Sequence, residues 1–160
     1  MSLPMTTTTK LEAALTYASW GWHVLPLIPN DKRPASAHGV HDATIDPEQI
    51  KAWWAQNPSF NIGIAAGEKS GIVVFDIDPR NGGSESWDDF TAEHGAVPDG
   101  ICQLTAGGGQ HYIAQSREGL KSCELRRGVD FLANGRYFVV TPSVVNDREY
   151  TWEASGDPTD

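Results

Sequence analysis

The chain has 160 residues, 39% of them hydrophobic, and a formal net charge of −9 at pH 7. The hydrophobic fraction is that of a folded globular protein, and the net negative charge argues against non-specific DNA binding by the whole surface. No apolar run reaches the roughly 20 residues of a membrane-spanning helix, and the two cysteines lack metal-ligand spacing, so we expect a cytoplasmic protein with reduced thiols and no membrane partner.

The first part of the chain predicts helices that alternate with short strands. Residues 1–9 are expected to be a disordered or expression-derived N-terminus, and a capping box that begins at Thr9 predicts the first helix. Residues 23–28 predict a strand, and Pro26 indicates that it lies at a sheet edge because proline has no N–H to donate. Asp46, which is followed directly by a proline, predicts the start of a second helix.

Strands become more frequent toward the C-terminus. Residues 61–65 and 71–77 predict two strands joined by a turn, and residues 83–95 predict a third helix. After this helix, short strands are expected at residues 101–105, 112–114, 129–132, 137–140 and 150–152. Residues 154–160 are expected to begin a linker or tail, so we predict one folded domain over residues 10–153.

Two aspartates, Asp76 and Asp78, stand one residue apart at the end of the strand predicted over residues 71–77. Residues i and i+2 of a strand project to the same face, so the two carboxylates are expected to lie close together. Two neighbouring anions favour a bound cation, and a hard divalent ion such as Mg²⁺ or Mn²⁺ prefers oxygen ligands. Pro79 ends the strand, so we predict a metal site where the strand passes into a loop.

Three consecutive glycines, residues 107–109, closely precede a second candidate residue, His111. Three consecutive glycines allow the backbone to approach a ligand and to direct N–H groups at phosphate oxygens, and His111 is placed to donate a hydrogen bond to the same polyphosphate. The alternative is a simple turn followed by a structural histidine.

Asp130 interrupts an apolar strand and is the third candidate. Its side chain is expected to project to the face opposite Val129 and Phe131. Two interpretations stay open at this stage: a solvated outer face of an antiparallel sheet, or a third carboxylate ligand.

The order of these features resembles the primase–polymerase family of the archaeo-eukaryotic primase superfamily. The resemblance covers residues 10–153 and includes the "VVFDID" segment that carries both aspartates. Further blocks are Trp20-Gly21-Trp22, residues 29–34, Trp53-Trp54, residues 61–64, Thr141-Pro142-Ser143 and the strand with Tyr150 and Trp152. The resemblance implies an α+β fold in which an N-terminal helix and strand lobe packs on a C-terminal lobe with an RNA-recognition-like antiparallel sheet. The active site is expected in the cleft between the lobes.

The resemblance also implies roles for the candidate residues. Asp76, Asp78 and Asp130 are expected to hold a pair of Mg²⁺ or Mn²⁺ ions about 4 Å apart, and His111 is expected to act in catalysis by contacting the triphosphate of the incoming nucleotide. Nucleotide binding is assigned to His111 together with Gly108, Gly109, Gln110, Lys32 and Arg33. Basic residues that are candidates to meet phosphates of the template or nucleotide are Lys32, Arg33, Lys121, Arg126, Arg127 and Arg136.

The expected function is template-directed nucleotidyl transfer, which comprises primer synthesis and extension on single-stranded DNA from nucleoside triphosphates. A C-terminal helicase or accessory domain and a role in plasmid or phage replication are expected from the same resemblance. The chain departs from the family at Gly107, where a serine is frequent, and at Gln110, where a basic residue is frequent.

Three alternatives compete with this interpretation. The first is a nucleotide- or DNA-binding replication module without catalysis. The second is a glycosyltransferase, in which a DxD motif holds Mn²⁺ on a nucleotide sugar. The third is a phosphatase of the haloacid-dehalogenase type, but Arg80 stands where that motif has threonine or valine.

Overall fold

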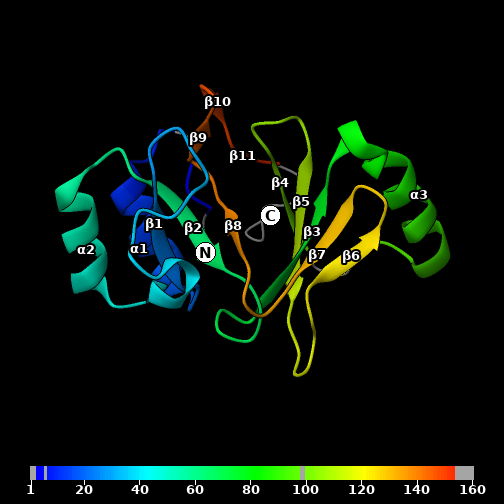
Figure 1. Ribbon diagram of the computed structural model, residues 1–160, viewed down its shortest axis with the longest axis horizontal. Helices are drawn as coiled ribbons and strands as arrows, with labels where there is room; N and C mark the ends of the chain where they lie inside the picture. The colour runs from blue at the N-terminus through cyan, green and yellow to red at the C-terminus, as the bar shows by residue number, and fades with distance from the viewer. Residues whose placement is uncertain (1–2, 6, 98–99, 154–160) are drawn as a thin grey trace.

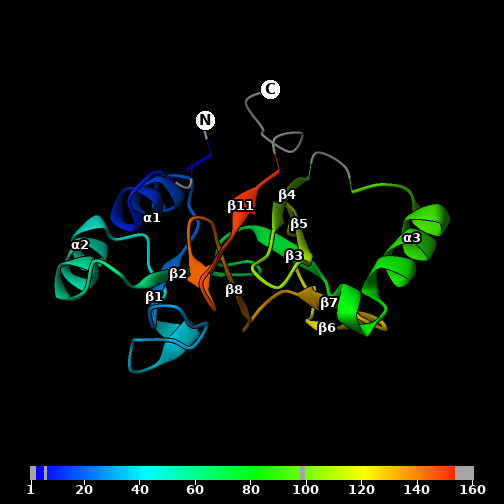
Figure 2. The same cartoon turned by 90° about the horizontal axis from the view of Figure 1, so that it is seen from above.

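The computed structural model describes residues 3–5, 7–97 and 100–153. This part of the chain forms three α-helices, a three-stranded and a six-stranded antiparallel sheet, and a two-stranded ribbon, which confirms the predicted α+β class. The helices α1 and α2 lie beside the three-stranded sheet and α3 lies beside the six-stranded sheet (Figure 1). Seen from above, α3 and the α1–α2 pair occupy opposite ends of the molecule, with the two sheets between them (Figure 2).

Local sequence signals set the starts of the first two helices. α1 (Lys10–Ser19) begins after Thr9, whose side chain accepts a hydrogen bond from the Glu12 backbone N–H over 3.2 Å. α2 (Pro47–Gln56) begins after Asp46, which accepts from the Glu48 N–H over 3.0 Å. Both predicted helices and their caps are therefore confirmed.

The three-stranded sheet has the order β1-β2-β8, formed by Val24–Leu27, Asn61–Ala65 and Tyr137–Val139. β1 lies at the edge, as its proline indicated. A short 3-10 helix, η1 (Gly39–Asp42), follows β1, and the ribbon pairs β9 (Val144–Val145) with β10 (Arg148–Glu149).

The six-stranded sheet has the order β11-β4-β5-β3-β7-β6. Its strands in chain order are β3 (Ile72–Ile77), β4 (Ile101–Leu104), β5 (Gln110–Gln115), β6 (Cys123–Arg126), β7 (Val129–Leu132) and β11 (Thr151–Trp152). α3 (Gly83–His94) packs on one face, where the Phe75 ring centroid lies 5.1 Å from that of Trp87. The predicted strands of this sheet are present, and β6 is an additional strand that the sequence did not indicate.

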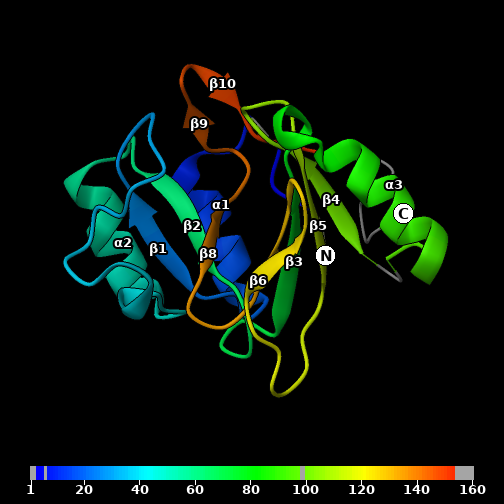
Figure 3. The same cartoon turned by 45° about the vertical axis from the view of Figure 1, so that its right-hand side comes forward.

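The two lobes are interleaved along the chain, which corrects the expected division into an N-terminal and a C-terminal lobe. β3 and α3 come from the first part of the chain but belong to the six-stranded sheet, whereas β8 comes from the second part and completes the three-stranded sheet. The consecutive strands β2 and β3 consequently lie in different sheets, and Figure 3 shows the chain passing from one sheet to the other between them. Turn residues indicate where a strand ends, but they do not determine which sheet the next strand joins.

One hydrophobic core joins both sheets. It contains α1 and α2 residues, strand residues of the small sheet, and Ile72 and Val74 of β3. Leu3, within the segment expected to be disordered, is 7% exposed and packs in this core. The other expected terminal segment, residues 154–160, lies outside the described residues, and the predicted domain limits stay a prediction. In the part of the chain that the structure describes, no helix has the length and apolar character to cross a membrane.

Candidate active site

The register of the six-stranded sheet places the candidate residues in one row. Asp76 of β3 is directly opposite His111 of β5 on one side and Asp130 of β7 on the other. The row continues outward to Gln103 of β4 and Glu124 of β6. Directly opposite residues of antiparallel strands project to the same face, so these five polar side chains share one face of the sheet.

The neighbouring row shows why this face is buried at one end and polar at the other. Val74 is opposite Ile113 and Leu132, and all three belong to the core shared by the two sheets. Two residues further along β3, the same face carries Asp76, whose side chain is 37% exposed. The polar row therefore begins where the core between the two sheets ends.

Asp130 projects as its alternation with the apolar residues predicted. Val129 packs in the cluster beneath α3, and the Phe131 ring lies 5.2 Å from that of Phe75 on the same face. Asp130 is exposed on the opposite face, beside Asp76. The two Cβ atoms of such a pair lie about 4.5–5.5 Å apart, and like charges at this separation destabilise the sheet.

Asp78 lies beside the turn between β6 and β7. Its backbone N–H donates to the Gly128 carbonyl over 2.8 Å, and Gly128 has φ +76°, a conformation that favours glycine. The Asp78 carboxylate caps the 3-10 helix η2 (Pro79–Asn81): it accepts from the Arg80 N–H at 3.0 Å and from Asn81 Nδ2 at 2.7 Å. This cap holds the carboxylate in its present orientation.

The three carboxylates are oxygen donors of the kind that a hard divalent cation prefers, and they line one cavity, but they do not form a preformed metal cage. Among the residues that the structure describes, no group of three or more His, Cys, Asp or Glu side chains is close enough to hold a metal ion. The Asp78 oxygens accept hydrogen bonds from Arg80 and Asn81 within the cap on η2.

The electrostatics of the row are asymmetric. Burial raises the pKa of Asp76, but the hydrogen bond and electrostatic attraction of His111, followed by Lys32 and Arg136, lower that pKa below its ordinary value. Burial raises the pKa of Asp130, and the nearby Asp76 charge raises it further. One carboxylate thus has a compensating donor, while the other experiences net repulsion that a bound cation would remove.

Two adjoining cavities open onto this face. The larger, of about 500 Å³, is lined by all three aspartates and His111, and its further polar wall comprises Lys32, Arg80, Asn81, Thr105, Glu124 and Arg127. The smaller, of about 310 Å³, has Arg136, Tyr137 and Val40 in its wall. Lys32, Asp76, His111 and Tyr150 line both cavities and therefore mark where the two meet.

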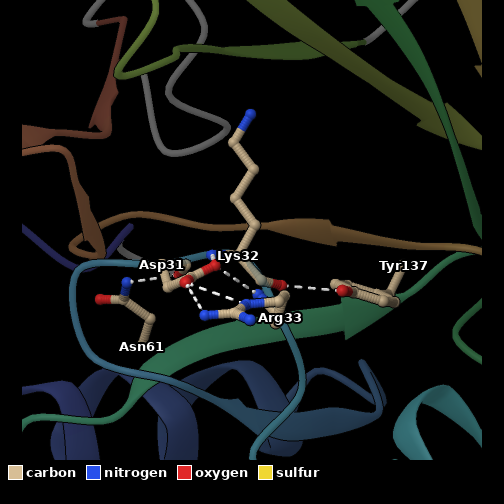
Figure 4. A network of polar contacts seen from close by, with 5 residues as sticks. All are labelled: Asp31, Lys32, Arg33, Asn61 and Tyr137. Atoms are coloured by element: carbon tan, nitrogen blue, oxygen red, sulfur yellow. Dashed lines mark hydrogen bonds and ion pairs between the residues drawn. The ribbon is translucent and has the colours of Figure 1, made fainter.

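The loop after β1 holds two adjacent basic residues, Lys32 and Arg33, in different environments. Arg33 forms a two-pronged ion pair with Asp31, with Nε and Nη2 at 3.0 and 2.8 Å from Oδ2. The loop is anchored because Asn61 donates to the Asp31 carbonyl and Tyr137 donates to the Lys32 carbonyl. The Lys32 side chain extends away from this network (Figure 4). Of the two predicted nucleotide contacts, Lys32 lines the cavities and Arg33 is held by Asp31.

The glycine turn between β4 and β5 differs from the expected phosphate cradle. The N–H groups of Gly108 and Gly109 donate to the carbonyl and hydroxyl oxygens of Thr105, so they are used within the turn. Gly109 is required sterically, because a Cβ there would lie 2.4 Å from the Ile77 carbonyl oxygen. Gln110 pairs with Ile77, and its side chain projects to the face opposite His111. In this structure both N–H groups are therefore bonded within the turn, and contacts of Gly108 and Gly109 with a nucleotide stay a prediction.

A cation reaches this turn from η2 instead. Arg80 Nη2 donates to the Gly107 carbonyl over 3.1 Å and occupies the space that a side chain at position 107 would enter. Sequence reasoning did not assign Arg80, Glu124 or Gln103 to the site. Arg80 follows Asp78 by two residues, but only the fold brings it to the turn. The signal for Gln103 was a glutamine within the apolar strand β4.

The histidine is held from its far side by Gln103. His111 Nδ1 lies 2.9 Å from Gln103 Nε2, and His111 Nε2 lies 3.4 Å from Asp76 Oδ1. Both Gln103 and His111 are buried, at 0% and 6% exposed. The imidazole therefore has a defined orientation, with one nitrogen toward the core and the other toward the cavity.

Comparison with protein families decides what kind of molecule carries this arrangement. The family model described as bifunctional DNA primase/polymerase, N-terminal, matches residues 14–160. The chain belongs to this family. No curated protein matches the chain closely enough to serve as a relative.

Membership in the primase/polymerase family confirms the resemblance that the sequence motifs indicated. Enzymes of this family are nucleotidyltransferases, and membership implies primase and polymerase activity, DNA and nucleotide substrates, and the use of a divalent metal. It also decides against the glycosyltransferase and phosphatase alternatives.

Proposed function

We propose that this primase/polymerase domain joins nucleoside triphosphates to a 3′-hydroxyl on a single-stranded DNA template, at the row centred on Asp76. The observation that carries the proposal is the sheet register, which puts Asp130 and His111 on either side of Asp76 in the wall of one cavity. Three chain segments that are distant in sequence supply an anion pair and a hydrogen-bond donor there. Such a combination suits the transfer of a phosphoryl group, which depends mainly on positioning and electrostatics.

Asp76, Asp78 and Asp130 are the residues we assign to divalent metal binding, as Mg²⁺ or Mn²⁺. When bound, a pair of such ions lowers the pKa of the attacking hydroxyl and neutralises charge on the departing pyrophosphate. The mutual repulsion of Asp76 and Asp130 supports this assignment, because it favours a cation between them. Asp78 takes part by leaving its cap on η2.

The triphosphate is assigned to the larger cavity. His111 directs Nε2 into it, Lys32 extends into it, and Arg80 is anchored over the glycine turn. Arg80 supplies a positive charge beside Gly107, where the family frequently has a polar side chain. Contacts from Gly108, Gly109, Gln110 and Arg33 stay predictions from the sequence.

The smaller cavity is assigned to the nucleoside part of the incoming nucleotide. Its wall contains aromatic and apolar side chains, Tyr137, Phe138 and Val40, together with the Arg136 cation. It adjoins the larger cavity at Asp76 and His111, so a nucleotide that spans both places its phosphates next to the carboxylates. The helicase or accessory partner and the plasmid or phage context stay predictions.

A primer-extension assay tests the assignment. The wild-type domain, a primed single-stranded DNA template and labelled nucleotides are incubated with Mn²⁺, beside a reaction without primer. Asp130→Asn is expected to lower extension about a hundredfold or more, because it removes one carboxylate from the charged centre. Asp89→Asn, an equal charge change at an exposed position of α3, serves as the matched control.

Two results would contradict the proposal. The first is extension by Asp130→Asn at the rate of the control variant, which would show that this carboxylate does not act in the reaction. The second is an equal loss of extension in Asp89→Asn, which would show that the effect follows net charge and not position.

A further inference from the structure

Gln103 is a fully buried polar residue in an otherwise apolar strand. It is 0% exposed, and its β4 neighbours Ile101 and Cys102 are buried apolar residues. A buried primary amide costs free energy unless its two donors and its carbonyl oxygen are all bonded. The partners of Gln103 therefore define what this position requires.

The orientation of the Gln103 amide is determined by two backbone groups that each have a single role. The Thr141 backbone N–H can only donate, and it lies 3.0 Å from Gln103 Oε1. The Val139 carbonyl can only accept, and it lies 2.6 Å from Nε2. The Thr141 hydroxyl adds a further donor to Oε1 at 2.9 Å. If the amide were reversed, its NH₂ group would face the Thr141 N–H and its carbonyl oxygen would face the Val139 carbonyl oxygen. Neither contact could form a hydrogen bond, so the atom assigned as Nε2 is the nitrogen.

This orientation determines the role of His111 Nδ1. One Nε2 hydrogen of Gln103 is taken by the Val139 carbonyl, and the other points at His111 Nδ1 over 2.9 Å. Nδ1 must accept this hydrogen bond, so it carries no hydrogen. A hydrogen on Nδ1 would place two buried N–H donors against each other, which costs the desolvation of both groups. The single ring hydrogen consequently lies on Nε2.

We propose that Gln103 is a positioning residue that holds His111 in the Nε2–H tautomer, with this N–H directed into the cavity beside Asp76. The tautomer follows from the contacts of Gln103 alone. The consequence for catalysis rests on the function proposed above: the Nε2–H is a fixed donor for an anionic phosphate oxygen of the bound nucleotide. Gln103 acts through His111 and does not touch the substrate.

The same network couples the histidine to the packing of the lobes. The carbonyl of Thr141 accepts a hydrogen bond from the buried Tyr17 hydroxyl of α1, and this hydroxyl accepts from Trp152 Nε1 of β11 at 3.1 Å. The backbone that orients Gln103 is thus held by a residue of α1 and a residue of the six-stranded sheet. A substrate-facing donor is in this way fixed from the interior of the molecule.

Long-range ¹H–¹⁵N correlation spectra of protein with ¹⁵N-labelled histidine test the tautomer directly. The His111 signals are assigned by their loss in His111→Asn. We expect wild-type His111 to show a protonated Nε2 and an unprotonated Nδ1. In Gln103→Glu, whose second carboxylate oxygen can only accept, we expect a protonated Nδ1. A wild-type spectrum with a protonated Nδ1, or with the averaged signals of two exchanging tautomers, overturns the proposal.

Kinetics separate positioning from a merely structural role. Gln103→Leu is expected to raise the KM for nucleotide in primer extension roughly tenfold, the loss that corresponds to one misdirected hydrogen bond, with a smaller change in kcat. Gln115→Leu, at an exposed position of β5, is the matched control. An unchanged KM in folded Gln103→Leu would overturn the role of the oriented Nε2–H in nucleotide binding.

If the Gln103 variants do not fold, the wild-type spectrum still decides the tautomer. If wild-type protein shows the Nε2–H form but no extension, the proposed function fails and the tautomer assignment stands.

Discussion

Asp76 lies between two cross-strand neighbours with opposite effects on its charge. His111 provides an N–H beside the carboxylate, while Asp130 adds a second negative charge. Three basic residues considered for phosphate binding differ in what holds them: Arg33 is paired with Asp31, Arg80 is bonded to the Gly107 carbonyl, and the Lys32 side chain extends from an anchored backbone (Figure 4). A cationic side chain that is not paired with a protein carboxylate can form a stronger ion pair with a phosphate, and Lys32 therefore suits this role better than Arg33.

Lys32 and Arg33 therefore offer a test at adjacent positions with the same loss of charge. Lys32→Ala is expected to raise the KM for nucleotide roughly 10- to 100-fold, because a charge-assisted hydrogen bond to phosphate is lost. Arg33→Ala is expected to change the KM less than about threefold, because its guanidinium is already paired with Asp31. Steady-state primer extension over a range of nucleotide concentrations measures both values. Equal effects of the two variants would contradict the assignment.

At the scale of elements, β3 is the strand on which the site depends. It is bordered by β5 and β7, and its register with these two neighbours sets His111 and Asp130 opposite Asp76. The register is specified by the adjacent apolar row around Val74, because a shift of one residue would expose that row and bury the charges. The Asp76 and Asp130 repulsion is the cost of this arrangement without a bound cation.

Removing that repulsion should stabilise the metal-free protein. In metal-free buffer at neutral pH, Asp130→Asn is expected to raise the free energy of unfolding by about 0.5 kcal/mol, which corresponds to roughly 1–3 °C in Tm. The pKa of Asp130 is raised, so its folded-state contribution is favourable when protonated and is lost as pH rises through that pKa. The gain in Asp130→Asn should accordingly vanish at a pH below about 3.9.

Added Mn²⁺ should reverse the order of thermal stability of wild type and Asp130→Asn. Wild-type Tm should rise with Mn²⁺ concentration because the ion binds only the folded state, and Asp130→Asn should respond much less. Thermal denaturation followed by circular dichroism, with and without a chelator, measures both effects. A variant that is less stable than wild type in chelator, or equally stabilised by Mn²⁺, would show that the two carboxylates do not interact as inferred.

At the scale of the whole molecule, one hydrophobic core is shared by the two sheets, further apolar clusters lie beside it, and several ionisable groups are buried. Burial raises the pKa of Cys102 to about 12, with Glu153 acting in the same direction. Burial, and then the Asp76 charge, raises the pKa of Tyr150 to about 12. Burial in the shared core likewise raises the pKa of Tyr17.

These shifts predict a loss of stability in alkali. The ordinary pKa values are 9.0 for Cys102 and 10.0 for Tyr150, so the unfolded chain loses these protons before the folded protein does. The stability from these groups is complete below the ordinary pKa and is lost as pH rises through the raised one. The free energy of unfolding should therefore fall as pH rises from 9 to 12. We expect Tyr150→Phe and Cys102→Ala each to make this fall smaller, by on the order of 1–3 kcal/mol. Urea denaturation at several pH values measures it, and a fall as steep in both variants as in wild type would contradict the prediction.

The amino-acid sequence by itself determined the local features of this protein. Thr9 and Asp46 mark helix starts, because a cap bonds to an N–H only two or three residues away. The alternation around Asp130 gave its face correctly, since the period of a strand is a property of neighbouring residues. The order of the DxD, glycine and aspartate segments, together with the further blocks, indicated the primase/polymerase family, which the comparison then confirmed.

Only the tertiary structure decided which of these segments meet. Asp76 is 54 residues from Asp130 in the chain, and their cross-strand pairing follows from how the faces of β3, β5 and β7 pack on the shared core. The same packing places β8 in the other sheet and brings Gln103 behind His111. Local patterns are silent on these contacts because each depends on the burial of an entire sheet face, to which residues throughout the chain contribute.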